Sequence, residues 1–206
     1  EAKLGLKFEH RHGQEYYTAQ LRPSQVETIK KAESSQSLLQ LINNWLQRMP
    51  FLKEGADTSF WNNYKTIYQG SLVEAEKNNL SAFEEIFGDN QLTGDRSLAP
   101  AACRAALFIM LYRGYPLLQL PFQLLNALLE IDEQLSSWRY RHMNMVHRMI
   151  GTRIGTGGST GKDYLKAAAD KHYIFREIAQ LNSFLIERRK LPVLNHDMEV
   201  KLGFVS

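Results

Sequence analysis

His142 is the candidate metal ligand of this sequence. It stands in residues 122–150, a long run without internal glycine or proline that predicts a helix closed by Gly151. Separations of 7, 3, 4, 3 and 4 residues place six side chains on one face of that helix, namely Leu128, Leu135, Trp138, His142, Met145 and Met149. We therefore predict that His142 points toward the apolar core.

Two interpretations of His142 follow from these spacings. A lone histidine on an apolar face is commonly a buried side chain satisfied by hydrogen bonds. Alternatively, its imidazole is the axial ligand of a haem iron, in a slot lined by flat and polarisable side chains such as Trp138, Met145 and Met149. No second histidine, cysteine or carboxylate stands three or four residues away, which argues against a zinc site built on this helix.

Residues 155–161 form a loop with four glycines in seven positions. Such a backbone can turn its N–H groups toward an anion, and the hydroxyls of Thr156 and Ser159 add donors. The sequence argues against a phosphate loop, because Asp163 stands where that motif requires serine or threonine and no strand pattern precedes the loop. A carboxylate is the better anion. Since Thr156 follows His142 by 14 residues, we predict that the loop folds back over whatever His142 holds; a flexible connector is the alternative.

The elements that must position these residues are predicted to be helices. Caps and breakers delimit helices at about residues 24–32, 35–49, 58–87, 100–113, 122–150 and 163–189. Asp57 is the expected cap of the third helix, and Gly70 marks a kink or break within it. No convincing alternating strand pattern and no internal repeat is found, so the predicted fold class is all-α.

Composition limits the class of protein. Apolar residues make up 44% and charged residues 23%, and the net charge of +3 comes without a long basic run, which argues against a dedicated nucleic-acid binder. Apolar stretches such as residues 117–129 are too short or too interrupted to span a bilayer. Cys103 is the only cysteine and is predicted to be a buried packing residue. We expect a cytoplasmic protein with neither a nucleic-acid nor a membrane partner.

Three segments taken together resemble the tryptophan 2,3-dioxygenase family. They are Trp138-Arg139-Tyr140-Arg141-His142, the run from Met145 to Gly151, and Gly155 to Ser159, with shorter matches at residues 121–125, 131–132, 164–165 and 3–5. The resemblance implies a helical bundle of the haem-dependent tryptophan/indoleamine dioxygenase type that binds haem b and assembles as a homotetramer. It also implies oxidation of L-tryptophan with O2 to N-formyl-L-kynurenine, a step of tryptophan catabolism in the kynurenine pathway.

The same resemblance assigns roles to His142 and Thr156, while the apolar face of the helix and the hydroxyls of the loop add Trp138 and Ser159 as candidates. His142 matches the proximal ligand of the haem iron, and Trp138 belongs to the surface that binds the haem. Thr156 matches the threonine that contacts the amino-acid end of the substrate, and Ser159 is a second candidate in the same loop. Thr160 stands where the family commonly has another serine, which keeps the hydroxyl. No catalytic residue is assigned on this chain.

The resemblance reaches only the C-terminal part of the family's sequence. The distal histidine, the aromatic walls and the arginine that binds the substrate carboxylate have no counterpart, since His10 and His12 lie in a polar loop. The chain also begins at Glu1 without a methionine. We expect residues 1–206 to be a single all-helical haem-binding domain, the C-terminal portion of a longer enzyme. A companion N-terminal segment, cleaved or separately encoded, would complete each pocket.

Three alternative functions differ from this expectation. A related haem-dependent monooxygenase of aromatic amino acids would share the proximal half. A non-catalytic haem-binding module would show haem absorbance without substrate turnover. A purely structural helical domain, with His142 simply buried, would show no haem absorbance.

Overall fold

The computed structural model describes residues 3–5, 19, 21–51, 57–87, 97–150 and 173–204. Every regular element in these ranges is a helix and none is a strand, which confirms the predicted all-α class. The α-helices are α2 Pro23–Ser34, α3 Leu38–Gln47, α5 Thr58–Ser71, α6 Asn78–Phe87, α7 Pro100–Leu111, α8 Pro116–Ile150, α10 Arg176–Gln180 and α11 His196–Lys201. The 3₁₀ turns are η1 Glu74–Glu76, η2 Leu181–Phe184 and η3 Arg188–Lys190.

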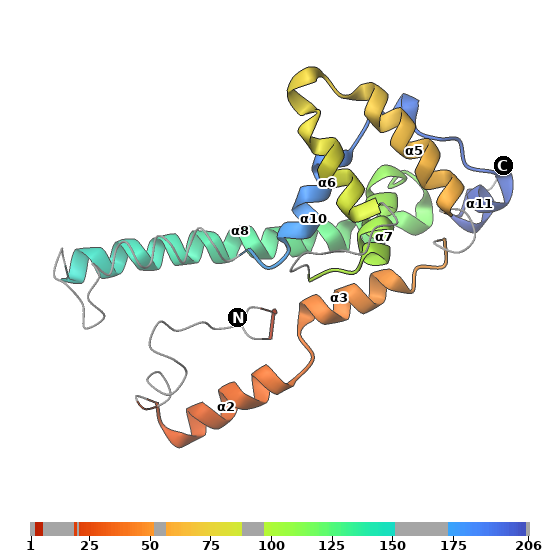
Figure 1. Ribbon diagram of the computed structural model, residues 1–206. Coiled ribbons are helices and arrows are strands. Elements are labelled where there is room, and N and C mark those ends of the chain that lie inside the picture. Colours follow the sequence, from red (N-terminus) through yellow and green to blue (C-terminus); the bar gives the residue numbers. More distant parts are fainter. Residues whose placement is uncertain are drawn as a thin grey trace.

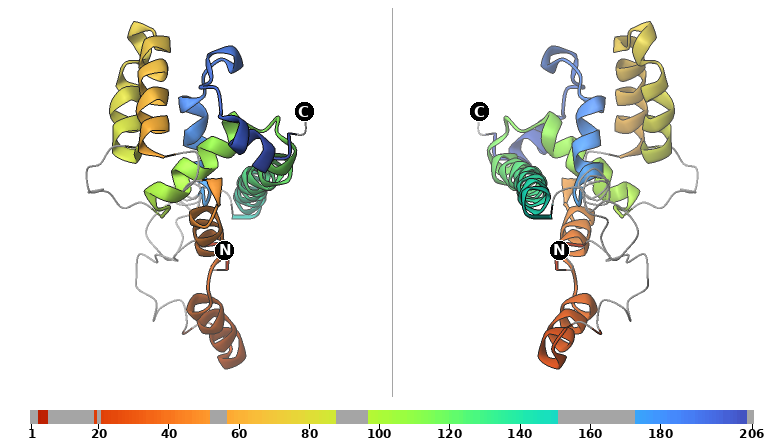
Figure 2. Two further views of the ribbon diagram at one scale, coloured as in Figure 1. Left: turned by 90° about the vertical axis from the view of Figure 1, so that its right-hand side faces the viewer. Right: turned by 90° about the vertical axis from the view of Figure 1, so that its left-hand side faces the viewer.

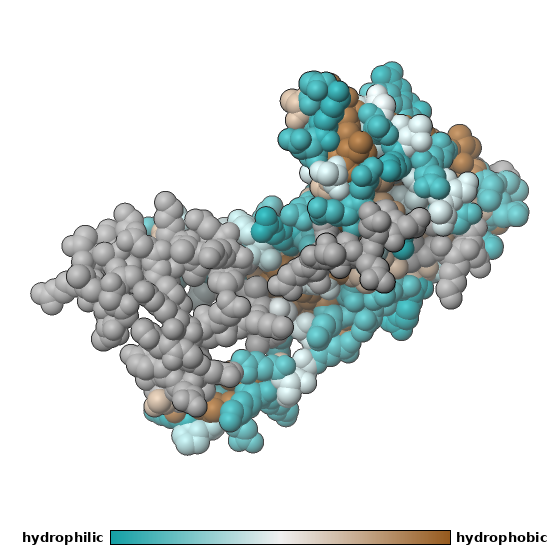
Figure 3. Space-filling view, viewed as in Figure 1, coloured by the Kyte–Doolittle hydropathy of each residue, from teal (hydrophilic) through white to brown (hydrophobic). Residues whose placement is uncertain are grey.

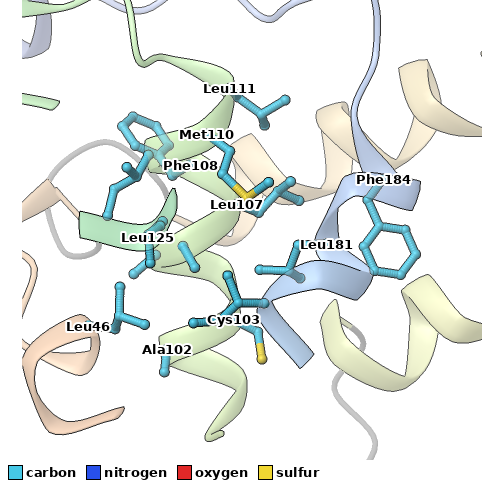
Figure 4. Close-up of a cluster of buried hydrophobic side chains, with 14 of the residues drawn as sticks. Leu46, Ala102, Cys103, Leu107, Phe108, Met110, Leu111, Leu125, Leu181 and Phe184 are labelled. Atoms are coloured by element: carbon cyan, nitrogen blue, oxygen red, sulfur yellow. The ribbon is translucent and has the colours of Figure 1, made fainter. Parts of the chain in front are cut away.

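Helix α7 is the centre of the packing. Nine of its twelve residues are buried, including every residue from 105 to 111, so the helix is covered on all sides. It contacts α3, α6, α8, α10 and η2, and Figure 4 shows side chains of α3, α8 and η2 meeting it around Leu107 and Phe108. Cys103 is 1% exposed within this cluster, which confirms its predicted packing role.

The start of α7 is held by side chains of two other helices. Asn43 in α3 accepts the N–H of Ala99 on its Oδ1 at 2.8 Å. The carboxylate of Glu177 in α10 accepts the N–H groups of Ser97 and Leu98 at 2.7 and 3.1 Å. Ala99 is the N-cap of α7 and offers no capping side chain, and Ser97 and Leu98 precede it. These acceptors therefore hold the segment that leads into the helix.

Helices α5 and α6 lie side by side (Figures 1 and 2) and pack aromatic rings against η2. The rings of Tyr68 and Phe83 stack with centroids 5.1 Å apart, and Phe184 stands edge-on to Phe83 at 5.5 Å. The hydroxyls of Tyr64 and Tyr68 donate to the carbonyls of Phe184 and Ser183 at 2.5 and 3.0 Å. Ring packing and hydrogen bonds therefore join the α5–α6 pair to the C-terminal part of the chain.

Helix α8 extends beyond the rest of the bundle (Figure 1). Its 35 residues correspond to a length of about 52 Å. The first half packs on the core through Leu118, Leu125 and Leu128, each 2% exposed or less. The second half continues past the core to Ile150, the end that the sequence predicted. Among the described helices, none has both the length and the apolar character needed to cross a membrane.

Two predicted helices have the wrong extent. The helix predicted over 58–87 begins as expected, with Asp57 accepting the N–H of Phe60 at 2.9 Å, but α5 ends at Ser71 and α6 begins at Asn78. The break lies beside Gly70, as the sequence indicated. The predicted start of this helix near residue 122, directly after Pro121, is also wrong, because α8 begins at Pro116 and continues through Pro121.

The helix predicted over 163–189 is wrong for its described part. Residues 173–175 are not helical, α10 covers only Arg176–Gln180, and residues 185–187 are neither α-helical nor 3₁₀. Backbone carbonyls of this stretch accept hydrogen bonds from Tyr64 and Tyr68. In a continuous helix the same carbonyls would accept from N–H groups of the helix itself. Helix α11, which Asn195 caps by accepting the N–H of Met198 at 2.8 Å, was not predicted.

Side chains are sorted strongly between the interior and the surface. On the face shown in Figure 3, the coloured residues are mainly hydrophilic and the apolar ones form separate patches. Phe108 is fully buried, with its ring 4.6 Å from that of Phe51 and 4.7 Å from that of Tyr112.

Substitution of Phe108 by alanine should leave a cavity in this ring cluster. We expect Phe108→Ala to lower the free energy of unfolding by about 3–5 kcal/mol, measured by denaturant titration. Leu120→Ala is the matched control, because Leu120 is 73% exposed and such a change is expected to stay within about 0.5 kcal/mol. Equal losses in the two variants would contradict the central position of Phe108.

Two buried tyrosines, Tyr64 and Tyr112, and the partly buried Tyr115 predict how stability depends on alkaline pH. Burial raises the pKa of Tyr64 and Tyr112. Burial, together with a 2.8 Å hydrogen bond to the Glu199 carboxylate, raises the pKa of Tyr115 to about 12. The pKa of an unfolded tyrosine is about 10, so above that pH the folded state binds more protons than the unfolded state.

Stability from these tyrosines should therefore be complete below pH of about 10 and fall as the pH rises toward 12. The free energy of unfolding is measured at intervals from roughly pH 9 to 11.5. It should stay constant up to about pH 10, the reference pKa of tyrosine, and decline above it. Tyr115→Phe removes one titrating group and should show a shallower decline. A flat profile, or the same slope in both proteins, would be the contrary result.

Candidate functional site

His142 lies in the second half of α8, beyond the part of the helix that packs on α7, and it is half-buried. Its ring stacks on the ring of Trp138, with centroids 5.4 Å apart and planes 10° from parallel. The two residues are four apart, so the helix itself brings the rings together. The stack restricts the directions in which the imidazole can point.

Three apolar side chains near His142 are exposed, although the adjacent Met143 is 7% exposed. Trp138 is 58%, Met145 51% and Met149 77% exposed, whereas Leu128 on the same face is 2% exposed. The prediction that this face points into the core is therefore confirmed for Leu128 and wrong for these three residues. The reason is that α8 is longer than the core it covers, so its apolar face continues where α7 no longer lies beside it.

This arrangement suits a flat, apolar ligand that carries a metal. An imidazole nitrogen can bind iron, and aromatic and thioether side chains make favourable contacts with a conjugated ring. Among the described residues, no three histidine, cysteine, aspartate or glutamate side chains come close enough to hold a metal ion together. Residues 134–150 contain three arginines and no acidic residue, so the local charge favours a ligand with carboxylates.

A buried carboxyl group joins α8 to the chain that resumes at Tyr173. Asp132 is 5% exposed, and its two oxygens accept the N–H groups of Ile174 and Phe175 at 2.9 and 2.6 Å. One turn further along α8, the hydroxyl oxygens of Ser136 and Tyr173 are 3.5 Å apart. The sequence assigned no role to Asp132, because its partners stand 42 and 43 residues away and no local pattern marks them.

A second feature, an apolar pocket of about 450 Å³, opens at the other end of α8. Its walls include Met49, Phe51, Leu117, Pro121, Met198 and Leu202. From Pro121 to His142 the helix rises by roughly 30 Å. The pocket is therefore separate from the face that carries His142.

The glycine-rich loop lies outside the described residues. The positions of Thr156 and Ser159, and the prediction that they stand over His142, therefore remain sequence predictions. The structure does bring Trp138 and His142 together, in the stack described above.

Known proteins are similar to nearly the whole chain. The sequence model of the tryptophan 2,3-dioxygenase family matches residues 74–185, which is more than half of the chain. Proteins named tryptophan 2,3-dioxygenase from Alteromonas mediterranea and Bdellovibrio bacteriovorus are 36% and 34% identical to it, over 99% of this chain and 64% of their own length. One of that name from Rattus norvegicus is 34% identical over 95% of this chain and 54% of its own. The chain thus spans less than two thirds of the length of these relatives.

Proposed function

The chain belongs to the tryptophan 2,3-dioxygenase family, and on that basis we propose that it is the haem-binding part of an enzyme that oxidises L-tryptophan with O2 to N-formyl-L-kynurenine. The reaction places both oxygen atoms across the C2–C3 bond of the indole ring. The observation that carries the proposal is the stack of His142 on Trp138, on an exposed apolar face of α8 within the matched residues. The relatives compared above all carry the dioxygenase name, which favours this reaction over the monooxygenase and the non-catalytic alternatives.

Haem b fits the residues around His142. The half-buried imidazole can give a nitrogen to the iron, while Trp138 holds its ring and Met145 and Met149 offer apolar surface to the porphyrin. The arginines of residues 134–150 complement the two carboxylates of haem b. When bound, the haem iron supplies the binding and activation of O2. The chain's own part is to hold and orient the cofactor and to keep water from that face.

We propose that Thr156 contacts the amino-acid end of tryptophan, with Ser159 as a second contact. A threonine hydroxyl in a loop rich in glycine N–H groups can donate to the α-carboxylate of the substrate, a charge-assisted hydrogen bond. The support for this role is the sequence alone: four glycines in residues 155–161 and a spacing of 14 residues from His142.

The rest of the pocket is proposed to come from a companion N-terminal segment, cleaved or separately encoded, because this chain carries no counterpart of the family's distal residues. By the same resemblance we propose a homotetramer in the cytoplasm, with no nucleic-acid or membrane partner. The direct test is an assay with reduced haem, O2 and L-tryptophan that follows N-formylkynurenine. Haem absorbance without product from the complete enzyme would argue for a different substrate or a non-catalytic module.

Loss of the imidazole should remove the haem. We expect His142→Ala to abolish stoichiometric haem binding, measured by the Soret absorbance of the purified protein. The far-UV circular dichroism spectrum should stay unchanged. His196→Ala, at an exposed position at the start of α11, is the control and should bind haem normally. A normal haem spectrum in His142→Ala would show that this residue is not the ligand.

Loss of the Thr156 hydroxyl should weaken tryptophan binding more than haem binding. A lost buried hydrogen bond corresponds to roughly 1–3 kcal/mol, which we expect as a higher KM for L-tryptophan in Thr156→Ala at unchanged haem content. Thr66→Ala, an exposed change in α5, should leave KM unaltered. Unchanged KM and kcat in Thr156→Ala would indicate that the loop is only a connector.

A further inference from the structure

The proposed function leaves Asp132 without a role, although it is one of only two buried polar or charged residues in the described part of the chain. A buried carboxyl group is costly unless it is hydrogen-bonded. Here each of its oxygens accepts one backbone N–H, from Ile174 at 2.9 Å and from Phe175 at 2.6 Å. Two bonds to successive residues define both the distance and the angle between α8 and the start of α10.

In the described part of the chain, packing on the core cluster stops partway along α8. Leu135 is the last residue of the helix that packs against this cluster; further along, Met143 is buried at 7% exposed but does not belong to the cluster. Contacts between apolar side chains are not directional, so they limit the rotation and the sliding of a helix less strictly than hydrogen bonds do. Asp132 therefore supplies the directional contact nearest to the point where α8 leaves the core.

The direction of His142 depends on the rotation of α8. His142 lies ten residues after Asp132, which places it about 15 Å further along the helix and roughly a quarter of a turn around its axis. Any rotation of α8 at Asp132 is therefore passed to the imidazole, because an unbroken helix joins the two residues. The contact between Ser136 and Tyr173, one turn nearer to His142, limits the same rotation.

We propose that Asp132 is a positioning residue for His142: its bonds to the backbone of Ile174 and Phe175 fix the rotation and register of α8, and with them the direction of the imidazole. The proposal rests on the proposed function, in which His142 binds haem iron. Asp132 acts through the helix rather than by contact with the cofactor. A ligand held to the productive geometry needs this kind of support, since small angular errors weaken coordination.

Glu177 provides a matched control. Its carboxylate also accepts two backbone N–H groups, from Ser97 and Leu98, but at the start of α7 rather than on α8. In each case the change from carboxylate to carboxamide replaces one accepting oxygen by an NH2 group. That group is itself a donor and then faces a backbone N–H that has lost its acceptor. Asp132→Asn and Glu177→Gln should therefore both lower the melting temperature, whereas only the first should disturb His142.

The test measures the rate at which the complete haem-loaded enzyme releases haem to an excess of apomyoglobin. We expect Asp132→Asn to release haem roughly 10- to 100-fold faster than the wild type, the range found when a residue supporting a metal ligand is lost. Glu177→Gln should stay within about twofold of the wild-type rate. The same rate in both variants would overturn the positioning role and leave the proposed function intact. A wild-type enzyme that binds no haem would overturn both.

A second pair of variants keeps the test decisive if Asp132→Asn does not fold. Ser136→Ala removes the contact with Tyr173, and Ser137→Ala changes the neighbouring serine, which is exposed. We expect haem release about two- to fivefold faster in Ser136→Ala, in line with the loss of one modest hydrogen bond. No difference between the two serine variants would count against the proposal.

Discussion

Helix α7 is buried on every side, so its apolar surface must be covered all round. Helices α3, α6, α8 and α10 and the turn η2 surround it. Two of these helices also bond to the backbone of residues 97–99, which lead into α7, through Asn43 and Glu177. Covering one helix therefore sets the positions of most of the others, including the first half of α8.

The second half of α8 does not help to cover α7. The candidate site, which lies on this half, is therefore separate from the core. The apolar face of the helix continues without interruption, but α7 covers only its beginning. Beyond Leu135 the same face presents Trp138, Met145 and Met149 to the surface, with His142 among them. In the proposed function, the haem and the companion segment of the enzyme cover this part, so one helix serves the protein core at one end and the cofactor at the other.

The chain after residue 172 is joined to the bundle by buried apolar side chains, such as Phe175 and Leu181, and by side chains of the bundle that bond to its backbone. Asp132 accepts N–H groups at its beginning, and the hydroxyls of Tyr64, Tyr68 and Tyr112 donate to carbonyls further along. These bonds hold a stretch that has only short helices of its own. The junction with α8 at Asp132 thereby connects the packing around α7 with the orientation of the helix that bears His142.

The sequence by itself determined the features that arise within one segment. The all-α class, the cap at Asp57, the burial of Cys103, the unbroken run of α8 to Ile150 and the family motif around His142 all follow from neighbouring residues. Only the tertiary structure decided which half of the apolar face of α8 is covered, and why residues 173–189 form no continuous helix. The physical reason is distance along the chain: the groups that settle these points, such as Asp132 with Ile174 or Tyr64 with Phe184, stand 42 and 120 residues apart.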